Sequence, residues 1–428
     1  MNRPSVLAVV CIVFLLSSVL IPFAKADWTM FRSGPSHSGA GTGSVVLTPK
    51  LLWNFTTDGT IDSSPAVANG VVYIGSDDGN VYALNAASGH KLWNYTTGGE
   101  IESCPAVANG VVYIGSADNN LYALNAADGK KLWNYSTGDN NYVVSAPTVV
   151  GGVVYAASYI YKVGAVDDYF GYVYAFNAAD GAMLWNFTTG GGVYSSPAVV
   201  GGVVYVGSED DNVYALNASN GDKLWNYTTG GFVESSPAVV DGVVYVGSDD
   251  GNVYAFNAAN GDKLWNYTTG AFIESSPAVV DGVVYVGSDD DTLYALNAAN
   301  GAKLWNFTTD EGVESSPAVV GGVVYVGSGE FNDGNIYAVN ATDGVKIWSF
   351  PAPGLVISSP AVVGGVVYIG SYNDNSVYAF GSLPPSSSDS LFVIVGVVIA
   401  ALIIVGLVFL TFRKRWKTKP TNPKLLIQ

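Results

Sequence analysis

The chain repeats one unit of about 40 residues, and this repeat constrains its fold more than any other feature. Each unit ends in Leu-Trp or Ile-Trp, and successive tryptophans are 40, 40, 52, 40, 40, 40 and 43 residues apart. They are Trp53, Trp93, Trp133, Trp185, Trp225, Trp265, Trp305 and Trp348. A unit of this size cannot bury its own apolar face, so neighbouring copies must pack against each other.

Each unit reads as four short strands, A to D, with the patterns "SSPAVV", "VVYVGS", "NVYALNA" and "KLWNYTT". The A and B strands are joined by Asn-Gly, Asp-Gly or Gly-Gly, pairs that accept the positive φ angles of two-residue hairpin turns. Strands A and B are almost wholly apolar, as expected for sheets covered on both faces. Four antiparallel strands repeated radially predict an all-β fold, the β-propeller.

The strand count predicts how the ring closes. Eight A strands begin at Pro65, Pro105, Pro147, Pro197, Pro237, Pro277, Pro317 and Pro360. The first D strand, Leu51–Thr57, precedes every A strand, and the last blade ends at "SVYAFG" without a D strand of its own. We therefore predict eight blades, with the N-terminal strand completing the eighth so that no orphan edge is left at the seam.

The two ends of the chain differ from the repeats. Residues 1–26 have the basic start, apolar run and Ala-x-Ala site of a cleaved signal peptide, with an uncleaved anchor as the alternative. Residues 391–412 form an uncharged apolar segment long enough for a transmembrane helix. The basic tail at 413–428 then predicts a single-pass cell-membrane protein with an extracellular propeller and a cytoplasmic C-terminus.

The expected domain order follows from these boundaries. A lead-in at 27–47 precedes the propeller at 48–381, and a Pro/Ser linker at 382–390 joins it to the segment at 391–412. Residues 27–390 carry 35 Asp or Glu against ten Lys or Arg, a net charge of −25. A body of this charge repels nucleic acid, so nucleic-acid binding is excluded as a function.

The repeat resembles the PQQ-like, or quinoprotein alcohol dehydrogenase-like, β-propeller family. Its tryptophan-docking pattern, Ala-x-Asp/Asn-x-x-x-Gly-x-x-x-Trp, stands here as Ala255, Asn257, Gly261 and Trp265. The resemblance covers roughly residues 28–381, and "DWTMFRSGPSHSGAG" at 27–41 looks like the lead-in of such proteins. It implies that each tryptophan packs between neighbouring blades.

The family contains quinone-dependent dehydrogenases and non-catalytic scaffolds, and the sequence departs from the enzymes. Their adjacent Cys–Cys pair is absent, since Cys104 stands alone, and no haem-attachment motif occurs. The two histidines, His37 and His90, lie outside the repeated positions and build no catalytic cluster. We predict a non-enzymatic protein without a cofactor, with Ca²⁺ as the candidate metal.

A glycosylation sequon follows most of the repeated tryptophans. Seven of these begin Asn-aromatic-Ser/Thr directly after Trp, and two more read Asn-Ala-Ser and Asn-Ala-Thr. The candidate sites are Asn54, Asn94, Asn134, Asn186, Asn226, Asn266, Asn306, Asn217 and Asn340. A glycan on outer strand D would protect an exposed edge, whereas the alternative is that Tyr and Thr simply suit strands. Glycosylation of a prokaryotic-looking repeat indicates an archaeal surface protein.

Acidic residues gather on one predicted face, formed by the D–A and B–C loops. Three residues before the strand-A proline, five of eight copies carry an acid at the mouth of the central channel: Asp62, Glu102, Glu234, Glu274 and Glu314. They predict a site for a divalent cation or a basic partner, and the alternative is a solvated charged rim.

The third blade carries 12 extra residues, most of them in its B–C loop on the same face. Its aromatic side chains are candidate partner contacts, namely Tyr159, Tyr161, Tyr169, Phe170 and Tyr172. The alternative is an insertion whose rings fold back onto the blade.

These features together predict a glycosylated surface protein whose propeller binds or scaffolds an extracellular protein or glycan. The rival hypotheses are a PQQ-dependent dehydrogenase and a structural component of the cell envelope.

Overall fold

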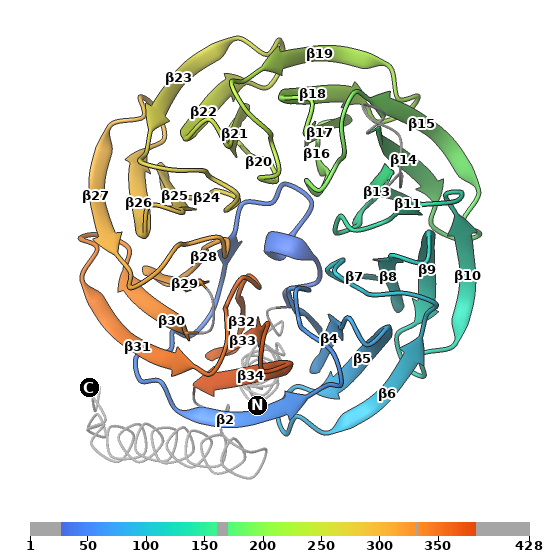
Figure 1. Cartoon of the computed structure of the whole chain (residues 1–428), viewed down its shortest axis with the longest axis horizontal. Helices are drawn as coiled ribbons and strands as arrows, with labels where there is room; N and C mark the ends of the chain where they lie inside the picture. The colour runs from blue at the N-terminus through green and yellow to red at the C-terminus, as the bar shows by residue number, and fades with distance from the viewer. Residues whose placement is uncertain (1–26, 161–169, 331–332, 382–428) are drawn as a thin grey trace, which may run out of the picture. The chain divides into compact units, whose positions relative to one another are not determined.

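The computed structural model describes residues 27–160, 170–330 and 333–381. In this part of the chain, eight antiparallel sheets stand radially around a central axis, and each has four main strands (Figure 1). The all-β, eight-bladed architecture is therefore confirmed. Within each blade strand A lies nearest the axis and strand D at the rim.

The A and B strands form the inner half of each blade. The A strands are β3 (Ala66–Ala68), β7 (Ala106–Ala108), β12 (Thr148–Val150), β16 (Ala198–Val200), β20 (Ala238–Val240), β24 (Ala278–Val280), β28 (Ala318–Val320) and β32 (Ala361–Val363). The B strands are β4 (Val71–Gly75), β8 (Val111–Ser116), β13 (Val153–Ile160), β17 (Val203–Gly207), β21 (Val243–Gly247), β25 (Val283–Ser288), β29 (Val323–Glu330) and β33 (Val366–Ser371). The turns between them have positive φ, as at Asn69 (52°) and Gly70 (79°), which explains the Asn-Gly and Asp-Gly pairs.

The C and D strands form the outer half. The C strands are β5 (Asn80–Asn85), β9 (Asn120–Asn125), β14 (Gly171–Asn177), β18 (Asn212–Asn217), β22 (Asn252–Asn257), β26 (Thr292–Asn297), β30 (Asp333–Asn340) and β34 (Ser376–Gly381). The D strands are β6 (Lys91–Thr96), β10 (Lys131–Ser136), β15 (Met183–Thr189), β19 (Lys223–Thr228), β23 (Lys263–Thr268), β27 (Lys303–Thr308), β31 (Lys346–Ala352) and β2 (Leu51–Thr56). Strand β11 (Asn141–Tyr142) extends the third blade, and β1 (Ala40–Gly41) pairs in parallel with β28.

The ring closes through β2, the first D strand of the chain. It pairs antiparallel with β34, the last C strand, and Trp53 stands opposite Ala379 and Phe55 opposite Val377. The two ends of the propeller thus share one sheet, and the edge of β34 is covered.

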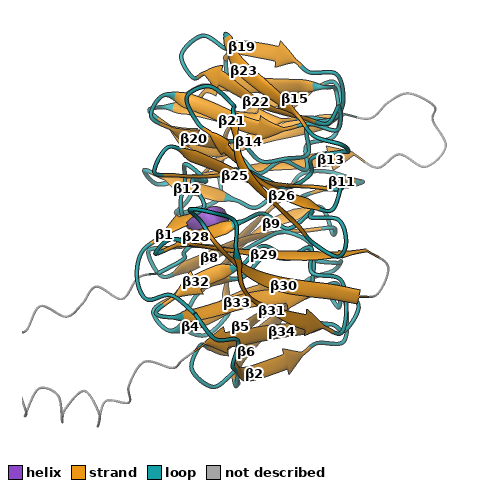
Figure 2. Ribbon diagram, turned by 90° about the vertical axis from the view of Figure 1, so that its left-hand side faces the viewer, coloured by secondary structure: helices purple, strands orange, loops and turns teal. Residues whose placement is uncertain are grey.

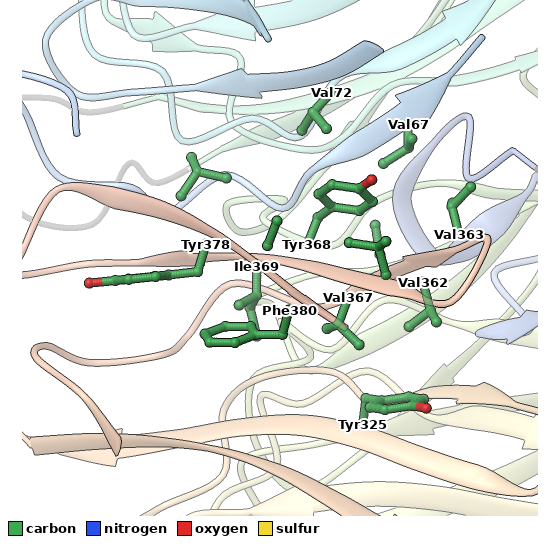
Figure 3. Close-up of a cluster of buried hydrophobic side chains, with 14 of the residues drawn as sticks. Val67, Val72, Tyr325, Val362, Val363, Val367, Tyr368, Ile369, Tyr378 and Phe380 are labelled. Atoms are coloured by element: carbon green, nitrogen blue, oxygen red, sulfur yellow. The ribbon is translucent and has the colours of Figure 1, made fainter. Parts of the chain in front are cut away.

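A buried apolar cluster backs this seam (Figure 3). Tyr368 and Phe380 of the eighth blade lie between Val67 of the first blade and Tyr325 of the seventh. Burying a side chain of this size contributes roughly 2 kcal/mol, so the seam combines backbone pairing with packing against both neighbours.

Seven of the eight repeated tryptophans lie on the C–D turn of the next blade, and Trp348 donates instead to Val46 O of the lead-in (2.8 Å). Trp225 Nε1 donates to Ala258 O (3.0 Å), and a Cβ on Gly261 would lie 2.7 Å from the Trp225 ring. The same bond recurs around the ring, and at the seam Trp53 Nε1 donates to Ala86 O (3.0 Å). The Trp of one repeat thus contacts the Gly of the next repeat, across the boundary between two blades.

The lead-in crosses the axis of the ring (Figure 1). Its carbonyls accept hydrogen bonds from the second residue of six A strands: Val67, Val107, Val199, Val239, Val279 and Val319, at 2.6–2.8 Å. These N–H groups lie on the inner edges of the blades and would otherwise be unpaired. In the side view of Figure 2 the lead-in's single helical turn, η1 (Phe31–Ser33), lies toward the left and β11, in a D–A loop, toward the right.

The predicted transmembrane helix is wrong on this evidence, and so is the single-pass membrane location that depended on it. In residues 27–160, 170–330 and 333–381 no helix is long and apolar enough to cross a membrane. An apolar run supplies composition alone, whereas a span needs a helix of about 20 residues, and the helix described here is the single turn η1. The segments 1–26, 382–390, 391–412 and 413–428 lie outside the described residues.

The closure generates a direct test. Replacing Leu51–Thr56 by a Gly/Ser segment of equal length should expose the β34 edge and remove the Trp53 contact with the first blade. We expect unfolding, or oligomers formed by strand exchange, in light scattering after size exclusion and in thermal melts. A monomer with the parent melting temperature would contradict closure by β2.

Candidate functional site

Two rings of hydrogen bonds hold the inner ends of the D–A loops around the axis. In five blades the first serine before the strand-A Pro bonds to the next blade, as where Ser235 Oγ donates to Ser275 O (3.1 Å) and accepts from Gly247 N of its own blade (3.0 Å). The second serine accepts a backbone N–H from the preceding blade, as where Ser236 N donates to Ser276 Oγ (2.9 Å). These bonds explain why Ser-Ser precedes the strand-A proline, a role that the sequence analysis missed.

The ring formed by the second serines continues across the seam and through Cys104. Ser359 N donates to Ser64 Oγ (2.8 Å), which joins the last blade to the first. Cys104 takes the place of a second serine, and its Sγ accepts from Ser64 N (3.1 Å). The thiol therefore has a place in the ring of hydrogen bonds.

The five predicted carboxylates stand immediately before this serine framework. Asp62, Glu102, Glu234, Glu274 and Glu314 are all partly buried, at equivalent positions of five blades. The other three copies carry Val144, Tyr194 and Ile357. The framework thus fixes an incomplete acidic ring around the axis, which we call the acidic mouth.

Burial and mutual repulsion raise the pKa values of the acidic mouth. Burial, followed by repulsion from neighbouring carboxylates, raises the pKa of Asp62 and Glu274 to about 8 and that of Glu102 and Glu234 to about 7. Glu314 is one of the repelling charges for Asp62 in the first blade and for Glu234 in the fifth. The acids therefore interact around the mouth.

The acids are nevertheless spread out. Among the described residues, no group of three or more His, Cys, Asp and Glu side chains is placed to hold a metal ion. The mouth is thus a ring of separated charges.

A second set of acids, in the B–C turns, has structural partners. Asp250 Oδ2 accepts from Tyr254 Oη (2.6 Å) and from Gly230 N (2.8 Å), so it ties the turn to the preceding D–A loop. Burial alone would raise the pKa of Asp250, but the hydrogen bonds from Tyr254 and Asn252 outweigh it and lower the pKa. The same arrangement recurs at Asp78, Asp118, Asp210 and Asp290. These carboxylates hold the loops in place.

The aromatic residues of the third-blade insertion divide into several groups. Tyr159 stacks on Tyr194 (ring centroids 4.6 Å apart) and meets Tyr142 edge-on, so it packs against the loops. Tyr172 stacks on Tyr174 in the same strand. Phe170 is 36% exposed. Tyr161 and Tyr169 lie outside the described residues.

Two exposed phenylalanines on this face were not singled out from the sequence. Phe232 is 48% exposed and Phe272 is 56% exposed, each two residues before an acid of the mouth. The equivalent positions in the six other blades hold Thr60, Glu100, Tyr142, Gly192, Gly312 and Leu355. The residue at this position varies from blade to blade, and Tyr142 and Leu355 at the same position are partly buried, so only the exposure of Phe232 and Phe272 in the structure identifies them.

The lead-in places two further ionisable groups on the axis. Arg32 is 2% exposed; its Nε donates to His37 O (3.2 Å), while its two terminal nitrogens have no hydrogen-bond partner in the described structure. Burial lowers the pKa of Arg32 to about 9, and burial followed by the Arg32 charge lowers that of His37 to about 3. His37 is therefore neutral and lies within hydrogen-bond distance of Thr148 Oγ1 (3.2 Å).

The seven sequons that follow tryptophans are exposed on the D strands, whereas Asn217 and Asn340 are partly buried at C–D turns. In four blades the sequon amide is also bonded across the sheet, as where Asn226 Nδ2 donates to Asn212 Oδ1 (2.8 Å). Thr228 Oγ1 donates to the same oxygen (2.7 Å). The Asn-aromatic-Thr pattern therefore has a structural use besides any modification.

The described residues do not fit the quinone site that the resemblance implies for its enzyme members. Cys104 is the one cysteine among them, and its sulfur belongs to the serine ring. No carboxylate group is placed to hold calcium, and the lead-in crosses the axis. We therefore derive no step through a quinone.

Comparisons with solved structures show how widely this fold occurs. BamB from Moraxella catarrhalis is 20% identical, with a TM-score of 0.63 over 78% of this chain and 100% of that chain. Quinohemoprotein alcohol dehydrogenase from Comamonas testosteroni is 16% identical, with a TM-score of 0.69 over 84% and 81%. The computationally designed Ika8 protein is 16% identical, with a TM-score of 0.66 over 78% and 100%. These likenesses show the fold alone.

The family model gives a more specific result. No curated protein matches the chain, and nothing in the comparisons supports an archaeal source. The model described as outer membrane protein assembly factor BamB matches residues 43–168, 169–275 and 269–380, which together span nearly all of the propeller. With its repeated tryptophan docking and its eight closed blades, the chain belongs to this BamB-like family of PQQ-type propellers.

Proposed function

We propose that this protein is a non-enzymatic binding or scaffold propeller whose working face carries the D–A and B–C loops. The observation that carries the proposal is the acidic mouth, where five partly buried carboxylates repel one another. Holding like charges together in a partly desolvated ring is unfavourable. A cationic partner would relieve that repulsion, and this relief would add to the free energy of binding.

The spacing of the acids favours a basic polypeptide over calcium as the partner. A Ca²⁺ ion needs six to eight oxygen ligands at about 2.4 Å, and no group of three acids in the described residues is placed to hold an ion. A polypeptide can reach several separated carboxylates with different Lys or Arg side chains. Membership of a family named for an assembly factor agrees with a protein partner.

Glycosylation is a second proposal, and it concerns the rim of the ring. The seven D-strand asparagines are exposed on the outermost strand, where a glycan would project away from the blades. A glycan there would protect the outer edge and leave the working face open.

The first prediction concerns pH. The folded pKa values of about 7 to 8 exceed the ordinary values of 3.8 for Asp and 4.5 for Glu. Between these limits the folded chain binds more protons than the unfolded chain, so stability is greatest at the acidic end. It should fall as the pH rises through about 7 to 8.

Thermal melts at fixed ionic strength across this range measure the effect. Changing Glu234, Glu274 and Glu314 to Gln should flatten the profile, whereas the matched change of Asp222, Asp262 and Asp343 to Asn on the opposite face should not. Equal profiles for both triple variants would contradict repulsion at the mouth.

The second prediction identifies the working face. We compare a face variant, in which all five mouth acids become Asn or Gln, with a control that has the same charge change. The control replaces acids at C–D turns on the opposite face: Asp128, Asp180, Asp222, Asp262 and Asp343, each by Asn. Cross-linking in the producing cells should join the parent and the control to the same protein partner, and the face variant should lose it.

Other outcomes of that comparison count against the proposal. Retention of the partner by the face variant would refute the acidic mouth as the working surface. Lateral association of copies, unaffected by either variant, would indicate a structural envelope component. Binding of PQQ with Ca²⁺, accompanied by alcohol oxidation, would indicate an enzyme.

The third prediction concerns the sequons. Peptide mapping by mass spectrometry of the purified protein should find glycans on exposed D-strand asparagines and none on the partly buried Asn217 and Asn340. If all seven D-strand sites are bare, the pattern serves only the cross-strand bonds, such as that between Asn226 and Asn212.

A further inference from the structure

Two exposed phenylalanines lie beside the acidic mouth on adjacent blades. Phe232 is 48% exposed and Phe272 is 56% exposed. They occupy the same position in the fifth and sixth blades, whose loops are joined by the bond from Ser235 Oγ to Ser275 O (3.1 Å). Large apolar side chains exposed at equivalent places on neighbouring blades beside one set of acids are candidates for an interaction surface.

The backbone beneath both side chains is fixed. Asp249 N donates to Phe232 O (2.9 Å), and Asp289 N donates to Phe272 O (3.1 Å). Each loop is therefore bonded to the B–C turn of its own blade before any partner arrives. A preorganised surface loses less conformational entropy on binding than a flexible one.

The charges around the two rings have one sign. Glu234 and Glu274 follow the phenylalanines by two residues, and the acids that interact with Glu274 include Glu234, Glu314 and Asp249. An apolar partner alone would not relieve the repulsion that Glu234 and Glu274 experience. A Lys or Arg side chain, by contrast, pairs with them and can also lie over an aromatic face.

We propose that Phe232 and Phe272, with Glu234, Glu274 and Glu314, form a docking surface for a polypeptide segment in which basic and apolar side chains alternate or lie adjacent. This rests on the proposed function and narrows it to one sector of the working face. The apolar side chains cover the phenylalanines, and the basic ones reach the three carboxylates. The aromatic rings contribute most of the binding free energy, and the acids favour a positively charged partner over a negatively charged one.

The test uses the full-length protein and three fluorescent peptides of equal length that alternate Arg-Leu, Arg-Gly or Glu-Leu. Anisotropy should show binding of the Arg-Leu peptide, with clearly weaker binding of the other two. Changing Phe232 and Phe272 to Ser should weaken Arg-Leu binding roughly tenfold or more. The matched control changes Leu224 and Leu264 to Ser; these are each 50% exposed on the outer strands of the fourth and fifth blades, and binding should not change. Melting temperatures establish that both variants are folded.

A pair of charge-removing substitutions distinguishes failure of this inference from failure of the proposed function. Changing Glu234 and Glu274 to Gln should weaken Arg-Leu binding and reduce its salt dependence. If that change weakens binding but the Ser variant binds like the parent, the acidic face stands and the phenylalanine surface is refuted. If neither change affects binding, both proposals fail.

Three further results would overturn the docking surface. Equal binding of Arg-Gly and Arg-Leu peptides would show a purely electrostatic contact. Absence of Arg-Leu binding to the parent would remove the proposed class of partner. Binding of a neutral oligosaccharide that depends on Phe232 and Phe272 would assign the surface to a glycan.

Discussion

The structure depends on backbone hydrogen bonds that pair the strand edges at the seam and most of the inner strand edges at the axis. At the seam β2 pairs with β34, so the first D strand of the chain completes the last blade. At the axis the lead-in carbonyls accept the inner N–H groups of six A strands. Unpaired edges recruit other chains, and both devices use residues that precede the first complete repeat.

The same framework determines what the loop residues can do. Ser235 and its equivalents bond one blade to the next, and the acids immediately before them are thereby held around one axis. Repulsion among Glu234, Glu274 and Glu314 follows from this placement. In contrast, Asp250 is bonded to Tyr254 and to the preceding loop. Acids on one face thus divide into those bonded within the loops, whose pKa the hydrogen bonds lower, as at Asp250, and those whose pKa burial and mutual repulsion raise, as at Glu274.

Near-identity of the repeats makes the departures informative. Phe232 and Phe272 stand at a loop position that varies among the copies and are solvent-exposed, whereas Tyr159 is packed between Tyr142 and Tyr194. The D–A loops that carry Phe232 and Phe272 contain no insertion, and they place these two rings beside the acidic mouth. This fold is shared with a quinohemoprotein dehydrogenase and with a designed protein, so function must be argued from such positions.

The sequence by itself determined the blade count, the strands of each blade and the closing role of the strand predicted at Leu51–Thr57. These follow from period, turn residues and the position of one unmatched D strand, all of which are local properties of the chain. It also placed Glu234 and its equivalents on one face, because alternation of antiparallel strands fixes which loops share a face. It could not assign the lead-in to the axis, or Cys104 to the serine ring. Nor could it distinguish Asp250 from Glu234, or the packed Tyr159 from the exposed Phe232. Those distinctions depend on contacts between different blades, which exist only once the ring has closed.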